Sequence, residues 1–235
     1  MKPFQFQQGT APWQAETGTL LHWYVTVDWD DPRHQPLARL LSDSRQVLRD
    51  AGFPLTPVEP EWVHITVDQI SRSADRVSTV QRGRLVRGVA RRLAGVPPFP
   101  VMVGSLLSYP SGVIADLHPD EDLSALHRIA RSATRAVLGE DACQYPFGVP
   151  HLTTAYAHGE ADSDQAQRLL RRVRPGHAPL WVTAVDLVDV TATTSATASA
   201  GGKTITWELV ERIPLGGGEA GSAQHGAGLS SWGRV

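Results

Sequence analysis

The spacing of apolar residues divides the chain into segments of strand-like and helix-like pattern. Runs rich in β-branched and aromatic residues predict strands over 19–29, 62–70, 150–157, 180–190 and 203–213, and two strands joined by a turn at 109–112 within 99–117. Apolar stripes at helical spacing predict helices over 35–51, 74–93, 122–138 and 163–173. Glycine or proline follows three of these helices, as expected where a helix ends. The pattern therefore predicts an α+β fold.

The predicted strands and helices follow each other in a similar order in the two halves of the chain. We expect one domain over residues 19–213, whose halves meet near the turn at 109–112. Residues 1–18 are polar and predict an N-terminal arm. Residues 214–235 are rich in glycine and predict a disordered tail, because such a segment cannot bury a core.

The overall composition is that of an ordinary globular protein, and it limits the classes of function. The chain has 235 residues, a formal net charge of −2 and 41% hydrophobic residues. This charge argues against wrapping of long nucleic acids, which needs a large basic surface. Neither a secretory segment nor a long apolar run is visible, so we expect a cytoplasmic protein without a membrane span. The single cysteine, Cys143, is interpreted as a packed residue and not as a nucleophile.

Two short segments carry the candidate chemistry, and each holds a histidine, an aliphatic residue and a threonine. Residues 62–67 read WVHITV and residues 149–154 read VPHLTT. Alternate side chains of a strand share a face, so His64 lies beside Thr66 and His151 beside Thr153. The same alternation directs the aliphatic neighbours to the opposite face. Each strand thus offers an imidazole next to a hydroxyl.

The paired motifs resemble those of the two-histidine phosphoesterase superfamily, in particular its 2′-5′ RNA ligase-like and RNA cyclic phosphodiesterase branch. The resemblance covers roughly residues 19–213, with one departure: Thr154 stands where the family usually has an aliphatic residue. It implies a bilobal fold in which two lobes are related by a pseudo-twofold axis. Each lobe would have an antiparallel sheet flanked by helices, with an active cleft between the lobes.

The resemblance also implies a chemistry, the cleavage of a 2′,3′-cyclic phosphate on RNA or on a nucleotide. His64 and His151 would act as general acid and base, and either could take either role, because an imidazole changes protonation near neutral pH. Thr66 and Thr153 would donate hydrogen bonds to the phosphate oxygens. No metal or cofactor is required, and no obligate protein partner is evident. The reverse reaction would join RNA ends through a 2′-5′ linkage.

Other residues were weighed as parts of the cleft. Trp62 lies two residues before His64, so in a strand it would share the face of His64. It could stack on a base or belong to the core. Tyr24 and His22 share a face of the first strand; a structural role is favoured, and a place in the cleft floor is the alternative. Phe147 could lie at the cleft mouth. Tyr156 lies four residues after Leu152, so by strand alternation it shares the face of Leu152 and is expected to pack inward.

Charged groups outside the motifs favour plainer interpretations. Arginines at helical spacing are expected on solvated helix faces rather than on a path for RNA. They are Arg84, Arg87, Arg91, Arg128, Arg131, Arg135, Arg168, Arg171 and Arg172. Asp116, His118 and Asp120 are interpreted as a helix entry and not as a metal site.

Two functions compete with the leading one. One is a phosphodiesterase for small signalling nucleotides, such as 2′-5′ oligoadenylate or ADP-ribose cyclic phosphate. The other is an inactive RNA- or nucleotide-binding module, which would have no chemical need for all four motif residues.

Overall fold

The computed structural model describes residues 1–4, 18–194 and 203–217, and the fold combines one antiparallel sheet with four α-helices in these ranges. The strands are β1 (Gly18–Thr26), β2 (Leu55–Pro57), β3 (His64–Ser73), β4 (Phe99–Tyr109), β5 (Gly112–His118), β6 (His151–Ala157), β7 (Ala178–Val182), β8 (Ala184–Thr194) and β9 (Lys203–Pro214). The helices are α1 (Gln35–Asp50), α2 (Thr79–Leu93), α3 (Glu121–Leu138) and α4 (Ser163–Leu170). The expected α+β class is confirmed.

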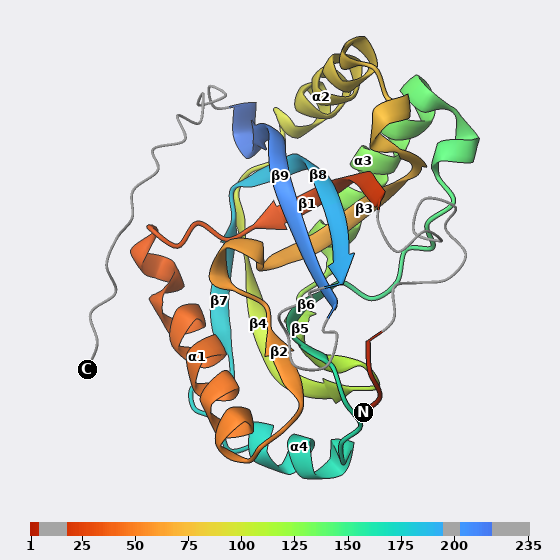
Figure 1. Cartoon of the computed structure of the whole chain (residues 1–235). Helices are drawn as coiled ribbons and strands as arrows, with labels where there is room; N and C mark the ends of the chain where they lie inside the picture. The colour runs from red at the N-terminus through yellow and green to blue at the C-terminus, as the bar shows by residue number, and fades with distance from the viewer. Residues whose placement is uncertain (5–17, 195–202, 218–235) are drawn as a thin grey trace.

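The strands follow the order β7-β4-β5-β6-β3-β1-β8-β9, and β2 pairs with β6 outside this path (Figure 1). Four strands therefore lie on each side of the junction between β6 and β3. At that junction the register gives a single pair, Ile65 with Leu152. The strands that carry the two histidine motifs are thus the two central neighbours of a curled sheet.

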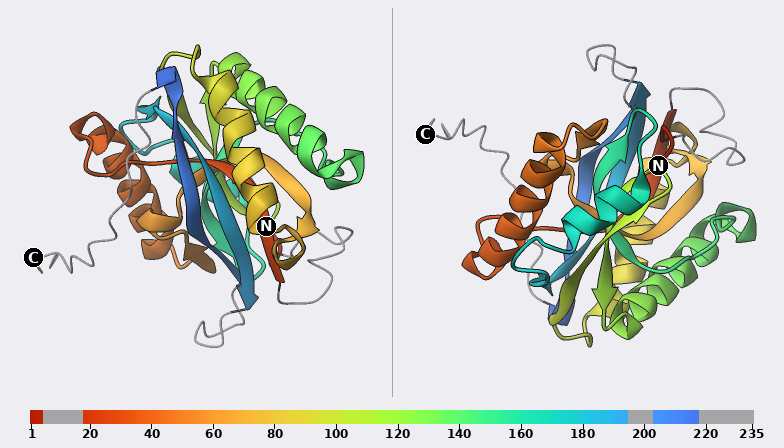
Figure 2. Two further views of the ribbon diagram at one scale, coloured as in Figure 1. Left: turned by 90° about the horizontal axis from the view of Figure 1, so that it is seen from above. Right: turned by 90° about the horizontal axis from the view of Figure 1, so that it is seen from below.

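The helices cover the sheet in two groups, which Figure 2 shows on opposite sides of the molecule. Helices α2 and α3 pack on the half that contains β3, whereas α1 and α4 pack on the half that contains β6. Helix α1 precedes β3 in the chain but covers the other half, and α3 follows β5 but covers the half of β3. The two halves of the sequence are therefore interleaved in space.

Amphipathic pattern explains how the helices are held. Helix α1 buries one stripe, made by Leu37, Leu40, Leu41, Ser44 and Leu48. Helix α2 begins with a capping box, in which the Ser78 hydroxyl accepts from the Gln81 amide N–H and the Gln81 side chain accepts from Ser78. The cap places the helix start at Thr79, so the predicted helix over 74–93 was too long at its N-terminus.

Two predictions about the chain path were wrong, and one strand was missed. The turn at 109–112 joins β4 to β5 within one half of the sheet, so the halves do not meet there. The segment 180–190 is not one strand: it breaks at Thr183 into β7, which pairs with β4, and β8, which pairs with β1. Strand β2 was not predicted, because three residues are too few for an alternating pattern.

The predicted arm and tail lie mostly outside the described residues. At the N-terminus the first four residues are anchored: the amide N–H of Phe4 donates to the carbonyl of Ala157 at 2.7 Å. The Phe4 ring lies 4.5 Å from that of Tyr156. Residues 215–217 form a short 3-10 helix, and Leu215 is buried. In the described parts, no helix has the length and apolarity needed to span a membrane.

Candidate active site

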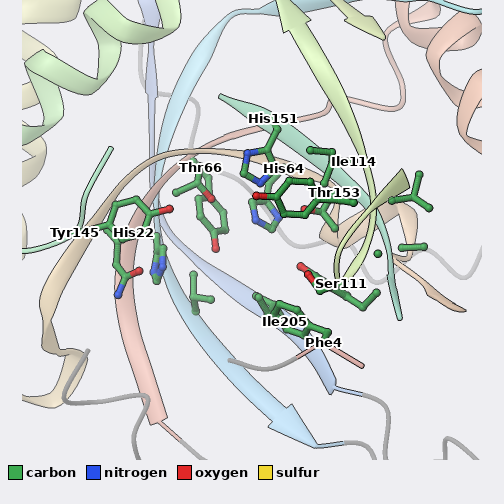
Figure 3. A pocket seen from close by; sticks show the side chains of 18 residues that line it. Phe4, His22, His64, Thr66, Ser111, Ile114, Tyr145, His151, Thr153 and Ile205 are labelled. Atoms are coloured by element: carbon green, nitrogen blue, oxygen red, sulfur yellow. The ribbon is translucent and has the colours of Figure 1, made fainter. Parts of the chain in front are cut away.

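A cavity of about 360 Å³ lies on the face of the sheet opposite the helices, above the junction of β3 and β6. His64, Thr66, His151 and Thr153 all line it, and Figure 3 shows these four side chains grouped around one space. The pairing of Ile65 with Leu152 produces this grouping, because the residues on either side of that pair point to the other face. Ile65 and Leu152 are themselves buried.

Each motif histidine is held by the same local device. The Nδ1 of His64 lies 2.7 Å from the carbonyl oxygen of Trp62, and the Nδ1 of His151 lies 3.0 Å from that of Val149. A carbonyl only accepts, so the proton of a neutral ring is placed on Nδ1. The Nε2 of each ring then carries the lone pair and is the nitrogen not engaged by the backbone.

The two rings differ in their surroundings. His64 is half-buried and stacks on Tyr24, with ring centroids 3.9 Å apart and planes 10° apart, whereas His151 is exposed. Burial, and to a smaller extent the nearby His151, lower the pKa of His64 to about 4, while the hydrogen bond to Trp62 opposes this shift. His64 is therefore neutral at neutral pH in the free protein.

Each motif threonine shares the cavity wall with a tyrosine. Thr66 pairs with Tyr24 of β1, and Tyr156 follows Thr153 on the same strand; all four residues line the cavity. Burial raises the pKa of both tyrosines, so both stay protonated. A protonated phenol and a threonine hydroxyl can each donate and accept a hydrogen bond, so this wall of the cavity is polar but uncharged.

A β-bulge follows each motif and changes which side chains reach the cavity. In β3 the register to β1 shifts between the pairs Tyr24–Thr66 and Trp23–Asp68, which leaves Val67 as the extra residue. Strict alternation would place Asp68 in the cavity, but after the bulge it is Gln69 that lines it. Gln69 pairs directly with His22 of β1, and His22 lines the cavity as well.

The bulge of β6 has the same position in its motif. Here the register to β5 shifts between Ile114–Thr153 and Val113–Ala155, and Thr154 is the extra residue. Its hydroxyl donates to the Val113 carbonyl at 3.2 Å, so this departure from the family pattern is buried without a lost hydrogen bond. Tyr156 is buried, as predicted, but the bulge places it at the cavity wall and not on the face of Leu152.

Two other residues predicted for substrate binding do not line the cavity. Trp62 belongs to a 3-10 helix before β3, so strand parity does not apply to it, and its ring packs edge-on against Trp207 at 5.6 Å. Phe147 stacks on His127 at 3.8 Å. Tyr24, the third predicted residue, lines the cavity together with His22.

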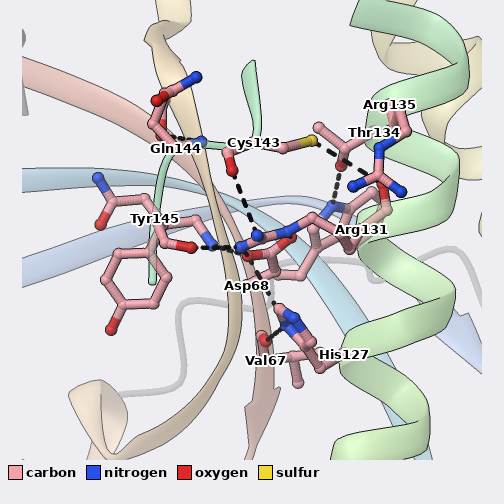
Figure 4. Close-up of polar contacts among 12 residues, drawn as sticks. Val67, Asp68, His127, Arg131, Thr134, Arg135, Cys143, Gln144 and Tyr145 are labelled. Carbon is pink, nitrogen blue, oxygen red and sulfur yellow. Dashed lines mark hydrogen bonds and ion pairs between the residues drawn. The ribbon is translucent and has the colours of Figure 1, made fainter. Parts of the chain in front are cut away.

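Behind β3, a buried ion pair holds the loop that leads to the second motif (Figure 4). Asp68, which the bulge directs to this side, is fully buried and accepts from the Arg131 guanidinium at 2.5 and 2.9 Å. Arg131 also donates to the carbonyl oxygens of Cys143 and Tyr145, at 3.2 and 2.6 Å. Tyr145 lines the cavity, so this network fixes one wall of it. Arg131 is therefore not on a solvated helix face as predicted.

The cavity lining is neutral apart from its histidines: among the described residues, no lysine, arginine, aspartate or glutamate lines it. Four arginines, Arg84, Arg87, Arg91 and Arg92, line a separate groove between α2 and α3 that shares no residue with the cavity. Within residues 1–4, 18–194 and 203–217, no group of three His, Cys, Asp or Glu side chains is placed to hold a metal ion. Burial raises the pKa of the Cys143 thiol, as expected of a packed cysteine.

Comparison with protein families gives a match to the model described as the 2′-5′ RNA ligase superfamily, over residues 31–193. This range is more than half of the chain and contains both histidine motifs. The chain belongs to the 2′-5′ RNA ligase superfamily. Membership supports a function of the phosphodiesterase type, in which phosphoryl groups are transferred. A search of curated proteins found no match.

Solved structures with the same fold include TT0787 of Thermus thermophilus and E. coli LigT in complex with 3′-AMP. TT0787 is 20% identical, with a TM-score of 0.57, and the match covers 85% of this chain and 99% of TT0787. LigT is 17% identical, with a TM-score of 0.54, over 84% of this chain and 98% of LigT. At these identities the likeness concerns the fold, and it covers nearly all of both relatives.

Proposed function

We propose that this protein is a cyclic phosphodiesterase that opens 2′,3′-cyclic phosphates of RNA ends or nucleotides by general acid/base catalysis. The observation that carries the proposal is that both histidines and both threonines line one cavity, with each histidine oriented by a backbone carbonyl two residues before it. Two imidazoles on one phosphate can remove a proton from water and give a proton to the leaving ribose oxygen.

We assign the base to His64 and the acid to His151. Burial lowers the pKa of His64 to about 4, so its Nε2 lone pair is available at neutral pH. His151 is exposed, so water solvates its protonated form, which the bound phosphate also favours. In this scheme His64 takes the proton of the attacking water, the new P–O bond forms, and His151 protonates the ribose oxygen as its bond to phosphorus breaks.

The threonines stabilise the charge that develops on the non-bridging oxygens. Thr66 and Thr153 approach from two different strands, and both line the cavity beside the histidine of their own motif. Such preorganised donors act where charge grows in the transition state. Since imidazoles carry both proton transfers, the scheme requires no metal or cofactor.

The test is turnover of a 2′,3′-cyclic mononucleotide and of a short RNA with a 2′,3′-cyclic end, with products identified by chromatography. We expect a single phosphomonoester product from each, and equal rates with and without EDTA. No turnover of either substrate would overturn the proposal, and strong inhibition by EDTA would overturn the metal-independent mechanism. Incubation of a cyclic-ended RNA with a 5′-hydroxyl RNA tests the reverse, 2′-5′ joining reaction.

A second candidate is a phosphodiesterase for small nucleotides such as 2′-5′ oligoadenylate. The size of the cavity, about 360 Å³, favours a substrate no larger than a nucleotide or two at the reacting centre. ADP-ribose cyclic phosphate is less favoured, because its pyrophosphate would meet no lysine or arginine among the described lining residues. An inactive binding module remains the outcome if ligands bind but are not turned over.

A further inference from the structure

The two ends of the cavity differ in chemistry, and the difference arises just after each bulge. His64 and Gln69 in β3 have the same spacing as His151 and Tyr156 in β6. Gln69 pairs with His22, whereas Tyr156 pairs with Gly112. Figure 3 shows His22 and Tyr145 at one end of the cavity and Phe4 and Ser111 at the other. The first end is polar, and the second is built from aromatic rings.

Gln69 has hydrogen-bonding capacity that the described part of the protein leaves unused. Its side chain is only 6% exposed, and it interacts with the buried His22 ring. The amide nitrogen Nε2 is buried and has no hydrogen-bond partner among the described residues. A buried donor without a partner is costly, and native proteins retain few of them. Gln69 lines the cavity, so a ligand that accepts from its side-chain amide would give this donor a partner.

The charge of this end restricts what the ligand group can be. Burial lowers the pKa of His22 to about 3, so the ring is neutral. Tyr145 contributes a hydroxyl whose pKa is raised by burial, and it is neutral too. With no lysine or arginine in the described lining, a second phosphate would lack a counter-charge. A neutral group with an acceptor atom, a carbonyl oxygen or a ring nitrogen, fits instead.

Position along the strand indicates which part of a nucleotide carries that group. Gln69 follows Thr66 by two to three strand steps, which places it roughly 7–10 Å further along β3. Ribose oxygens next to the phosphate do not extend that far. The edge of the base is the part of a nucleotide most remote from its 2′- and 3′-oxygens.

We infer that Gln69, supported by His22 and Tyr145, forms a subsite that binds the hydrogen-bonding edge of the nucleobase and determines base preference. The inference rests on the proposed function for the position of the phosphate. Tyr145 owes its place to Arg131, whose bond to its carbonyl oxygen fixes the loop. The subsite is thus built on the same bulge that sends Asp68 to Arg131.

The experiment measures binding, so that it does not depend on turnover. Titration calorimetry compares the four nucleoside 3′-monophosphates with ribose 3-phosphate, which lacks a base, on the wild type and on Gln69→Met. Gln46→Met is the matched control, because Gln46 is exposed on α1. We expect at least one base to bind about tenfold more tightly than another, as one good hydrogen bond allows. Gln69→Met should remove that preference and leave ribose 3-phosphate unchanged.

Equal affinity for all four bases on the wild type would overturn the inference. Equal weakening of the nucleotides and of ribose 3-phosphate by Gln69→Met would also overturn it, because it would indicate a structural role. Should Gln69→Met fail to fold, Gln69→Glu replaces it, because this variant keeps the shape of the side chain but lacks the amide donor. The base preference should then be lost as well. Retained preference would contradict the inference. If the wild type binds with a base preference but turns over no cyclic phosphate, only the proposed function is refuted. If it turns over cyclic phosphates but binds all bases equally, only the base subsite is refuted.

Discussion

His64 and His151 occupy equivalent places in two neighbouring strands, yet the protein surrounds them differently. His64 is half-buried beneath Tyr24, and its pKa is lowered to about 4, while His151 stands exposed at the start of β6. The neighbour strand explains the difference, since β1 gives His64 an aromatic ring at the place where β5 offers no such ring. Equal motifs can therefore support unequal roles when burial lowers the pKa of one histidine.

The largest expected effect is the loss of either histidine. His64→Ala and His151→Ala should each lower kcat on a cyclic nucleotide by about 10²–10⁴-fold, because each removes one proton transfer. His118→Ala is the control, since His118 is exposed and does not line the cavity. The double variant should lose little more than a single one, because the two rings act in one step. An additive double loss would contradict the concerted scheme.

The pH profile separates the two roles. In the free wild-type enzyme, kcat/KM should rise with pH through about 4, where His64 loses its proton and becomes able to act as the base. His64→Ala should lose this acidic limb, whereas His151→Ala should lower the rate and keep the limb. If His151→Ala removed the acidic limb instead, the assignment of acid and base would have to be exchanged.

The residue after each bulge offers a second comparison, this time of stability. Asp68 in β3 corresponds to Ala155 in β6, so only the first strand carries a buried ion pair. Asp68→Ala leaves Arg131 without its partner and should lower the free energy of unfolding by about 3–5 kcal/mol in urea titration. Asp141→Ala, which breaks an exposed pair with Arg72, should change it by about 1 kcal/mol or less. Similar losses in both would refute the anchoring role of Asp68.

Beyond the bulges, the sequence alone no longer predicted which side chains face the cavity. Strand alternation over residues 64–66 and 151–153 correctly predicted that the two histidines and two threonines lie on one face. Both segments end before the bulge of their strand, so alternation still holds within them. One residue later a bulge inverts the alternation. Tyr156 was therefore assigned to the wrong face, and Gln69 was not considered at all. A bulge depends on the pairing with the neighbouring strand, and a single sequence does not reveal that pairing.

The sequence did not predict which half of the sheet each helix covers or where each strand pairs, for a similar reason. Elements 35–51 and 122–138 were predicted nearly to the residue from their apolar stripes, but a stripe does not say which half of the sheet it covers. The helices exchange halves, and the segment around Thr183 passes from one sheet edge to the strand beside β1. Local pattern thus predicted the elements, and only long-range packing decided their neighbours.

A smaller effect is expected from the threonines. Thr66→Val and Thr153→Val each remove one donor from the phosphate while keeping the β-branched shape, and each should lower kcat by about 10²-fold. If the two threonines hold different oxygens, the losses should multiply in the double variant. A single loss no larger than twofold in either variant would show that its hydroxyl does not contact the phosphate.

The smallest expected effect comes from the tyrosines behind the threonines, and it returns to the difference between the histidines. Tyr24→Phe and Tyr156→Phe each remove only a hydroxyl, so kcat should fall a few-fold at most, in line with one neutral hydrogen bond.

Tyr24→Ala removes the ring that covers His64 as well. Less burial means a higher pKa for His64, so the acidic limb of kcat/KM should move upward from about 4 toward the ordinary value of 6.5. Tyr156 stacks on neither histidine, so Tyr156→Ala should leave that limb in place. A limb that moves equally in both alanine variants would mean that general loosening of the cavity, and not the stacked ring of Tyr24, lowers the pKa of His64.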